Sequence, residues 1–312
     1  MEYITIKNTD IRVSRLALGG CPLGGHGWGE TTMSELEGAV YTALDSGITF
    51  FDTADTYGLG QSELLLGKAL EGHRKDVIIN TKFGVRAGTG KTFYDNSPEW
   101  IRTALEASLR RLKTDYIDIY TIHYRDGVTP ISVVGETLEE LRRKGYIRYI
   151  GLSNIYKDEL EELEPYADQF VTFQDEYSLA CRKNEGDILE LSSRLKMTPV
   201  SWGSLGQGIL TGKFSRDNLS FGSNDRRSRD VYVNFHGEKL EKNLQIVEHM
   251  RKVAEKYGKP VSAVAIRFIL DFIPESVVLC GAKRPSQVLG NVQGTDWKLD
   301  AEDLKLLDEV SR

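Results

Sequence analysis

The sequence has few cysteines, no long apolar run and no excess of positive charge. Its three cysteines, Cys21, Cys181 and Cys280, lie far apart and show no disulfide or metal-ligand spacing, which fits a reducing compartment. No apolar run approaches the ~18 residues that cross a bilayer, and residues 1–13 alternate polar and apolar side chains, unlike a signal peptide. The formal net charge of -6 gives no sign of binding to nucleic acid or an anionic membrane. We therefore expect a cytoplasmic protein.

Motifs for two kinds of catalytic centre are also missing. The five histidines show no i,i+4 pair and no HExxH spacing, so we expect no metal site. A serine hydrolase would need a GxSxG motif, and none occurs. The glycine-rich stretches 24–29 and 206–213 fail the spacings of the dinucleotide-binding and P-loop motifs. The backbone amides of the second stretch still suit a phosphate group.

What the sequence does contain is a regular alternation of short apolar runs with helical segments. A short hairpin is expected over residues 3–16, and strands then alternate with helices, which is typical of a parallel sheet. Eight such units predict one (β/α)8 barrel domain over residues 1–312, with a doubly wound open sheet as the rival. The predicted strands cover residues 16–19, 48–52, 77–81, 116–122, 148–152, 170–174, 199–202 and 276–279.

Helix ends carry recognisable signals. Thr32 and Glu35 form a capping-box pattern, and Pro98 follows Ser97 at the start of another helix. Residues 203–236 show no clear period, and a loop of this length is usually functional or disordered. Within it, Arg226-Arg227-Ser228-Arg229 is either a solvated charge run or a clamp over an anionic cofactor. The predicted helices cover 32–45, 62–70, 97–112, 133–144, 157–166, 187–195 and 286–292, with extra helices near the C-terminus over 237–257, 262–272 and 301–310.

Polar or aromatic residues stand where the predicted strands end. In a barrel these positions lie together on the C-terminal face, where functional residues are found. One such residue means little, but a set at successive strand ends is hard to explain as packing. In chain order these residues are Asp52, Tyr57, Lys82, His123, Ser153, Asn154, Gln174 and Trp202.

Asp52 and Lys82 indicate a functional site only when they are considered together. Alone, Asp52 would more commonly be a strand-end cap, and Lys82 a solvated strand end. On adjacent strands they would form a buried ion pair, which is costly and therefore suggests a task. An ammonium beside the Tyr57 phenol would lower its pKa from ~10 and make it a usable general acid. His123 is either a satisfied core histidine or a polariser of a carbonyl, and its neighbours favour the second interpretation.

Together these residues resemble the signature of the aldo-keto reductases. The resemblance rests on Phe50-x-Asp52-Thr53-Ala54-x-x-Tyr57-Gly58, on Lys82 in its Thr-Lys-Phe-Gly setting and on His123. It continues through Gly151-Leu152-Ser153-Asn154, Gln174, 206–213 and 281–291 and covers roughly residues 10–295. The family is a (β/α)8 barrel that transfers a hydride between NAD(P)H and a carbonyl.

The resemblance implies a role for each matching residue. Tyr57 would give a proton to the carbonyl oxygen, Lys82 held by Asp52 would lower its pKa, and His123 would orient the carbonyl. Two cations near the adenosine end favour NADP(H) over NAD(H). The cofactor residues would be Ser153, Asn154 and Gln174 at the carboxamide, Trp202 against the ring, Gly203, Leu205, Gly208, Lys213 and Arg226 around the pyrophosphate, and Gly281, Lys283, Arg284, Gln287 and Asn291 at the adenosine and 2′-phosphate. Trp28 and Tyr124 are candidate substrate contacts.

The sequence departs from the family at three places. Gly203-Ser204 replaces a common Ser-Pro, Cys280 a common Pro, and Gly290 a common acidic residue. The leading hypothesis is an NADPH-dependent reductase of aldehydes or ketones acting on a small molecule. The alternatives are a cofactor-sensing regulatory subunit with little turnover and an NAD-dependent sugar or alcohol dehydrogenase. Nothing in the sequence predicts the physiological substrate or the oligomeric state.

Overall fold

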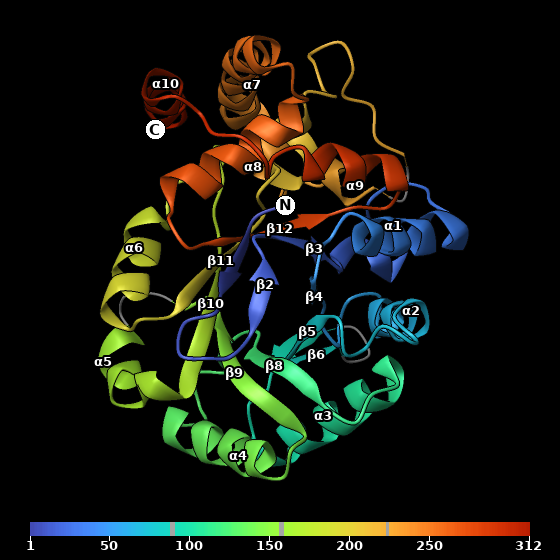
Figure 1. The fold of residues 1–312 in the computed structure, drawn as a ribbon, viewed down its shortest axis with the longest axis vertical. Helices are drawn as coiled ribbons and strands as arrows, with labels where there is room; N and C mark the ends of the chain where they lie inside the picture. The colour runs from blue at the N-terminus through green and yellow to red at the C-terminus, as the bar shows by residue number, and fades with distance from the viewer. Residues whose placement is uncertain (88–90, 156–158, 223–224) are drawn as a thin grey trace.

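Eight parallel strands close into a barrel in the computed structural model, which describes residues 1–87, 91–155, 159–222 and 225–312, except for the side chain of residue 160. The barrel confirms the predicted fold, and the open sheet is wrong (Figure 1). Its hydrogen-bonded order is β10-β11-β12-β3-β4-β5-β8-β9. The strands are β3 (Leu16–Gly19), β4 (Phe50–Asp52), β5 (Ile78–Phe83), β8 (Ile117–Ile122), β9 (Ile147–Ser153), β10 (Phe170–Glu176), β11 (Thr198–Trp202) and β12 (Val277–Gly281).

Helices surround the barrel in Figure 1. The Thr32 capping box and the Ser97 cap are present as predicted, and each satisfies helix-terminal amides. The eight α-helices that alternate with strands are α1 (Met33–Asp45), α2 (Gln61–Ala69), α3 (Pro98–Leu112), α4 (Ile131–Arg143), α5 (Leu160–Leu163), α6 (Glu185–Arg194), α8 (Val261–Phe272) and α9 (Pro285–Val292). Two further helices, α7 (Gly237–Tyr257) and α10 (Ala301–Ser311), pack together near the C-terminus.

The fifth predicted helix differs from the structure. Residues 156–158 of the expected range 157–166 lie outside the described residues. The described part is the short α5, followed by a 3-10 helix over Glu164–Gln169. Pro165 explains the change, because proline lacks an amide donor and disfavours the α conformation of the residue before it.

The N-terminal hairpin closes the end of the barrel where the strands begin. It consists of β1 (Tyr3–Thr5) and β2 (Arg12–Ser14), which pair antiparallel and lie in front of the barrel in Figure 1. Ile6, Ile11 and Val13 are buried against apolar side chains of the barrel strands, among them Phe50 and Val277. These apolar side chains fill the barrel interior at the end where the strands begin.

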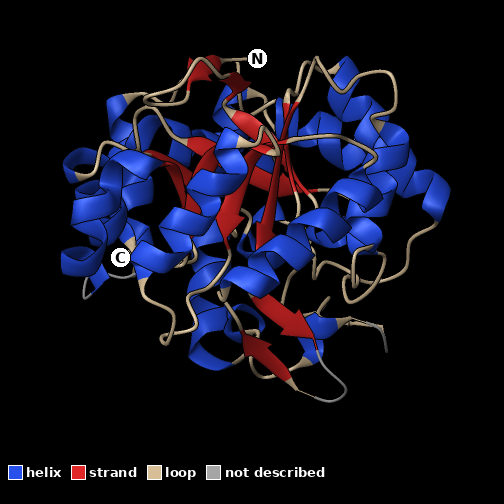
Figure 2. Ribbon diagram, turned by 90° about the horizontal axis from the view of Figure 1, so that it is seen from below, coloured by secondary structure: helices blue, strands red, loops and turns tan. Residues whose placement is uncertain are grey.

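A second hairpin projects from that opposite end and was missed in the sequence. It consists of β6 (Val85–Ala87) and β7 (Thr92–Tyr94), directly after β5, and Figure 2 shows it on the side away from the N-terminus. The predicted strand 77–81 was also too short, because β5 continues through Lys82 to Phe83. The described part of the long segment 203–236 contains short 3-10 turns and isolated β-bridges, one between Ser215 and Asn218 and others from Asp225 to Gly27 and Trp28.

Candidate active site

Asp52 and Lys82 meet at the carboxyl ends of β4 and β5. Asp52 pairs in register with Asn80, so Lys82 lies two residues further along the same face of its strand. The Lys82 Nζ atom donates to Asp52 Oδ1 at 2.7 Å and lies 3.4 Å from the Tyr57 hydroxyl oxygen. Both charged side chains are at most 3% exposed. The structure therefore brings three of the four expected catalytic side chains together in one buried cluster.

The second carboxylate oxygen of Asp52 is held by two amides. Asn80 Nδ2 donates to Oδ2 at 2.7 Å, and Gln174 Nε2 donates to the same atom at 2.8 Å. Asn80 in turn accepts from the Thr121 hydroxyl at 2.6 Å. These bonds satisfy a carboxylate that would otherwise be costly to bury. Asn80 and Thr121 were missed in the sequence, although Asn80 precedes Lys82 by two residues and so shares its face.

The pKa of the Tyr57 phenol is set mainly by burial. Removal from water raises the pKa of Tyr57 well above its ordinary value, and the Asp52 charge raises this pKa further. The expected lowering of this pKa by Lys82 is therefore wrong. Desolvation is the larger effect, and the Asp52 carboxylate, bonded to Lys82 at 2.7 Å, opposes the stabilisation that this ammonium gives to a phenolate. Tyr57 consequently keeps its proton at neutral pH.

His123 completes the cluster as a neutral imidazole. Burial lowers its pKa well below the ordinary value, and the Lys82 charge lowers this pKa further. The ring lies edge-on to Tyr57, with 5.9 Å between the ring centroids. Its Nδ1 atom is buried without a hydrogen-bond partner among the described residues. A proton on Nδ1 would be a buried donor without an acceptor, so we place the proton on Nε2.

One cavity of about 800 Å³ connects this cluster with nearly all other predicted site residues. Asn154 Nδ2 donates to the His123 carbonyl at 2.9 Å, which links the fourth and fifth strand ends. Residues on the cavity wall that the sequence did not single out include Cys21, Gln207 and Tyr232. The predicted residues on the wall are Trp28, Asp52, Tyr57, Lys82, His123, Tyr124, Ser153, Asn154, Gln174, Trp202, Gly203, Leu205, Gly208, Lys213, Gly281, Lys283, Arg284, Gln287 and Asn291.

Arg226 is the predicted residue that does not line this cavity. Its amide donates to the Gly27 carbonyl at 3.0 Å, and its guanidinium contacts His26 Nε2 at 2.8 Å. Its neighbour Arg227 lines the cavity instead and is held by Asp225 Oδ1 at 2.8 Å. The basic run was the right signal, but which arginine faces inward depends on backbone contacts that the sequence does not reveal.

The loop after β11 and the segment that follows it bring positive charge to the cavity wall. Gly203, Gly206 and Gly208 have φ values of 67°, 55° and 106°, a region that side chains disfavour. Lys213 and Arg227 lie on the same cavity wall. The amides of Gly206 and Gly208 already donate to the Gly203 and Leu205 carbonyls at 2.7 and 2.8 Å, so the positive charge of Lys213 and Arg227 is what this loop offers to a phosphate. The cavity thus offers an anion-binding loop between a proton-donating cluster and the cations Lys283 and Arg284, and this set of groups fits a nicotinamide dinucleotide.

The described residues hold no group of three or more His, Cys, Asp or Glu side chains arranged to bind a metal ion. Within the same described ranges, no helix has both the length and the apolar character needed to cross a membrane.

The barrel, the buried cluster and the cavity are together typical of oxidoreductases that bind a dinucleotide. The model of the aldo/keto reductase family matches residues 15–312, so the chain belongs to the aldo-keto reductases. It is therefore an oxidoreductase of a family that uses nicotinamide cofactors.

Three similar proteins illustrate the range of this family. The structure of the glycerol dehydrogenase AKR11B4 from Gluconobacter oxydans is 36% identical, with a TM-score of 0.88 over 99% of this chain and 94% of that one. The NADH-specific methylglyoxal reductase of Escherichia coli (strain K12) is 31% identical over 100% of this chain and 98% of its own length. An aldo-keto reductase from Klebsiella pneumoniae in complex with NADPH is 25% identical, with a TM-score of 0.77 over 100% and 96% of the two chains.

Proposed function

We propose that this protein reduces the carbonyl group of a small aldehyde or ketone with NADPH, with Tyr57 as the general acid. The observation that carries the proposal is the Lys82 ammonium, held by Asp52 and lying 3.4 Å from the Tyr57 hydroxyl on the wall of a cavity. The same cavity is lined by an anion-binding loop and by His123. Proton donor, charge stabiliser and cofactor loop thus surround one space.

The proton chemistry follows from these contacts. The nicotinamide, when bound, supplies the hydride. Tyr57 is protonated at neutral pH because burial raises its pKa, so it can donate that proton to the carbonyl oxygen. The phenolate that remains is stabilised by the Lys82 ammonium 3.4 Å away. His123, neutral and protonated on Nε2, donates a hydrogen bond to the same carbonyl oxygen and orients it. In the direction of alcohol oxidation Tyr57 accepts the proton.

The cofactor residues divide along the cavity. Ser153, Asn154 and Gln174 would hold the carboxamide, and the bond from Gln174 Nε2 to Asp52 fixes the orientation of the Gln174 side chain for this role. Trp202 would lie against the nicotinamide ring. The remaining groups are Gly203, Leu205, Gly208 and Lys213 for the pyrophosphate, and Gly281, Lys283, Arg284, Gln287 and Asn291 for the adenosine end. Lys283 and Arg284 favour a 2′-phosphate and hence NADP(H).

The substrate end of the cavity is aromatic. Trp28 lies edge-on to Tyr232 with ring centroids 5.8 Å apart, and Tyr124 lies beside His123 with ring centroids 5.1 Å apart. All four side chains line the cavity. We infer that Trp28 and Tyr124 contact the carbonyl substrate.

The Tyr57→Phe variant tests the proposal. It removes the transferable proton and keeps the ring, so we expect at least a hundredfold loss of kcat with an aldehyde substrate. NADPH binding, measured by nicotinamide fluorescence, should stay within about twofold of wild type. Unchanged turnover in this variant would refute the assignment of Tyr57 as the acid.

A second candidate is an NAD(H)-dependent enzyme that oxidises a sugar or alcohol. It is favoured by the ion pair between Arg284 and Glu35, which already occupies one of the two cations. A panel of aldehydes with NADPH and of polyols with NAD⁺ separates the two functions. Tight cofactor binding without turnover of any panel member would instead point to a cofactor-sensing subunit.

A further inference from the structure

We propose that Glu35 acts against the 2′-phosphate of NADP(H) by competing for Arg284, so that the protein discriminates less between NADPH and NADH than its two cations alone would. This inference rests on the proposed function, because it concerns the cofactor of the same site.

Glu35 is fixed in place by both carboxylate oxygens. Oε1 accepts from Arg284 Nε at 2.7 Å. Oε2 accepts from the Thr32 amide at 2.9 Å and completes the capping box at the start of α1. The Arg284 bond and the Thr32 amide lower the pKa of Glu35 to about 2, so the group is ionised throughout the neutral range. Glu35 cannot turn away from Arg284 without disturbing the cap of its own helix.

Arg284 stands between two hollows. Its side chain lines the large cavity and also a smaller one of about 460 Å³, whose wall includes Glu35 and residues 25–27 and 29–32. Glu35 lines only the smaller hollow. Besides its bond to Glu35, Arg284 Nη2 donates to the Glu30 carbonyl at 3.2 Å. A ligand that reaches Arg284 from the large cavity therefore meets a guanidinium that is already paired with a carboxylate.

This pairing has opposite consequences for the two cofactors. A phosphate monoester carries nearly two negative charges at neutral pH, so at Arg284 it would compete with, and be repelled by, the Glu35 carboxylate. A ribose 2′-hydroxyl carries no charge and can donate a hydrogen bond to a carboxylate, as it does to the acidic residue of NAD-binding folds. Glu35 therefore weakens NADPH binding and leaves NADH binding unchanged or slightly stronger.

The Glu35→Gln variant isolates the charge. Glutamine is accepted at this position of a capping box, so the helix start is kept. The measurement is the dissociation constant of NADPH and of NADH, each by titration of nicotinamide fluorescence. We expect the ratio of the NADH constant to the NADPH constant to rise about threefold to fivefold, which is the upper range for a partly exposed ion pair. The rise should shrink at high salt.

Glu37→Gln is the matched control. Glu37 lies two residues further along α1 and pairs with Lys68 at 2.6 Å, away from Arg284. This variant removes the same charge from the same helix, and we expect the ratio to stay at the wild-type value. In the background of Arg284→Ala, the change Glu35→Gln should also lose its effect on the ratio, since the competition acts through Arg284.

The outcomes separate the two proposals. An unchanged ratio in Glu35→Gln, or an equal rise in Glu37→Gln, would overturn the role of Glu35 while leaving the reductase function intact. If the wild-type protein binds neither nucleotide, the proposed function and this inference both fail. A rise confined to Glu35→Gln and dependent on Arg284 supports the inference.

Discussion

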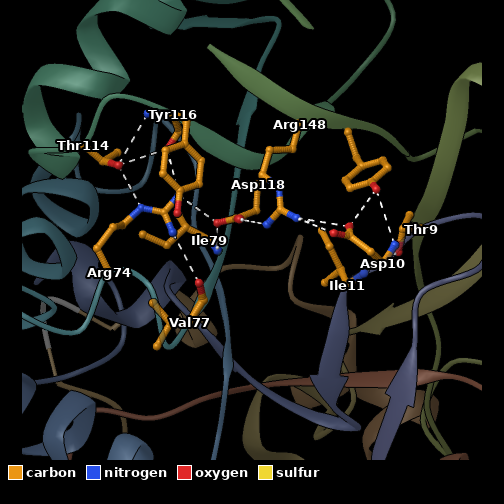
Figure 3. Close-up of polar contacts among 11 residues, drawn as sticks. Thr9, Asp10, Ile11, Arg74, Val77, Ile79, Thr114, Tyr116, Asp118 and Arg148 are labelled. Carbon is orange, nitrogen blue, oxygen red and sulfur yellow. Dashed lines mark hydrogen bonds and ion pairs between the residues drawn. The ribbon is translucent and has the colours of Figure 1, made fainter. Parts of the chain in front are cut away.

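Two buried aspartates sit at opposite ends of this barrel, and their partners differ in kind. Asp52, at the carboxyl end of β4, has one cation, Lys82, and two neutral amide donors. Asp118, at the start of β8, has two guanidinium partners: Arg74 at 2.8 Å and Arg148 at 2.9 Å (Figure 3). Both carboxylates are almost completely buried, at 2% and 1% exposure. Burial alone therefore does not tell a carboxylate of the proposed active site from a structural one.

The two sites differ in what the cations contact besides the aspartate. Arg74 also donates to the Tyr116 and Val77 carbonyls, and Arg148 reaches Asp10 in the turn of the N-terminal hairpin at 3.1 Å (Figure 3). Asp118 itself accepts from the Ile79 amide at 3.0 Å. Planar, multidentate arginines suit such a static junction of strands and hairpin. At the other end the compact Lys82 ammonium reaches a phenol on a cavity wall, and a point charge there can stabilise a change of protonation.

The largest expected effects come from breaking the two aspartates separately. Asp118→Asn removes the carboxylate partner of Arg74 and one of the two carboxylate partners of Arg148, so we expect the free energy of unfolding to fall by about 3 kcal/mol. Turnover of the folded protein should stay within about twofold. Asp52→Asn leaves Lys82 without its anchor, and we expect kcat to fall by about a hundredfold. Urea denaturation and steady-state kinetics on both variants provide the two readouts.

An equal loss of turnover in Asp118→Asn and Asp52→Asn would contradict the proposal that Asp118 is structural and that Asp52 supports turnover. So would a folded Asp52→Asn variant with full activity. Both variants are isosteric with the wild-type side chain, so neither result can be assigned to a change of side-chain volume.

The meeting of Asp52, Tyr57, Lys82 and His123 could be foreseen because parallel strands bring their carboxyl ends to one face. The other partners of Asp52 could not be predicted, because they depend on tertiary contacts. Asn80 and Thr121 look like ordinary polar positions until the strand register places them beside Asp52.

The direction of the Tyr57 pKa shift depends on burial, which no short motif encodes. Arg226 and Arg227 are held differently by tertiary contacts, Arg226 at Gly27 and Arg227 at Asp225. The pairing of Glu35 with Arg284 joins residues 249 positions apart. Sequence motifs thus predicted which residues gather at the site. The ion pairs and the protonation states could be inferred only from the three-dimensional structure.

Asp55 sharpens the comparison because it is a third carboxylate largely withdrawn from water, with no cation bonded to it among the described residues. Its Oδ1 atom is buried without a partner in that part of the chain. Burial and then the nearby Glu63 charge raise the pKa of Asp55 to about 8. Glu63 is itself held by Arg111 Nε at 2.6 Å, and Lys82 and Arg111 only partly offset the shift. A buried carboxylate without a bonded cation is thus kept neutral.

This predicts a pH-dependent stability. Between the ordinary Asp pKa of about 3.9 and about 8, the folded protein binds one more proton at Asp55 than the unfolded chain. The free energy of unfolding therefore falls as pH rises through this window. Asp55→Asn mimics the protonated form. Between pH 5 and pH 8 we therefore expect its free energy of unfolding to fall by about 1–3 kcal/mol less than that of the wild-type protein. Urea midpoints at both pH values measure this, and parallel losses in the two proteins would show that Asp55 is ionised when folded.

The smallest expected effect concerns the hairpin at the catalytic end. Tyr94 stacks on Tyr124 with ring centroids 5.0 Å apart, and Tyr124 lies 5.1 Å from the His123 ring. Its neighbour Phe93 is equally exposed (48% against 47%) but packs under Arg86 instead. Because stacked aromatic pairs contribute about 0.5–1.5 kcal/mol, we expect Tyr94→Ala to raise KM for an aromatic aldehyde by about two- to fivefold.

Tyr94→Phe keeps the stacked ring and should behave as wild type, and Phe93→Ala should leave KM unchanged. Cofactor affinity serves as the internal reference, since neither residue lines the cavity. Equal KM changes in Phe93→Ala and Tyr94→Ala would mean that the hairpin acts only through its general stability. A change confined to Tyr94→Ala would show that the β6–β7 hairpin contributes to the proposed active site through Tyr124, whereas the hairpin at the other end packs apolar side chains into the barrel.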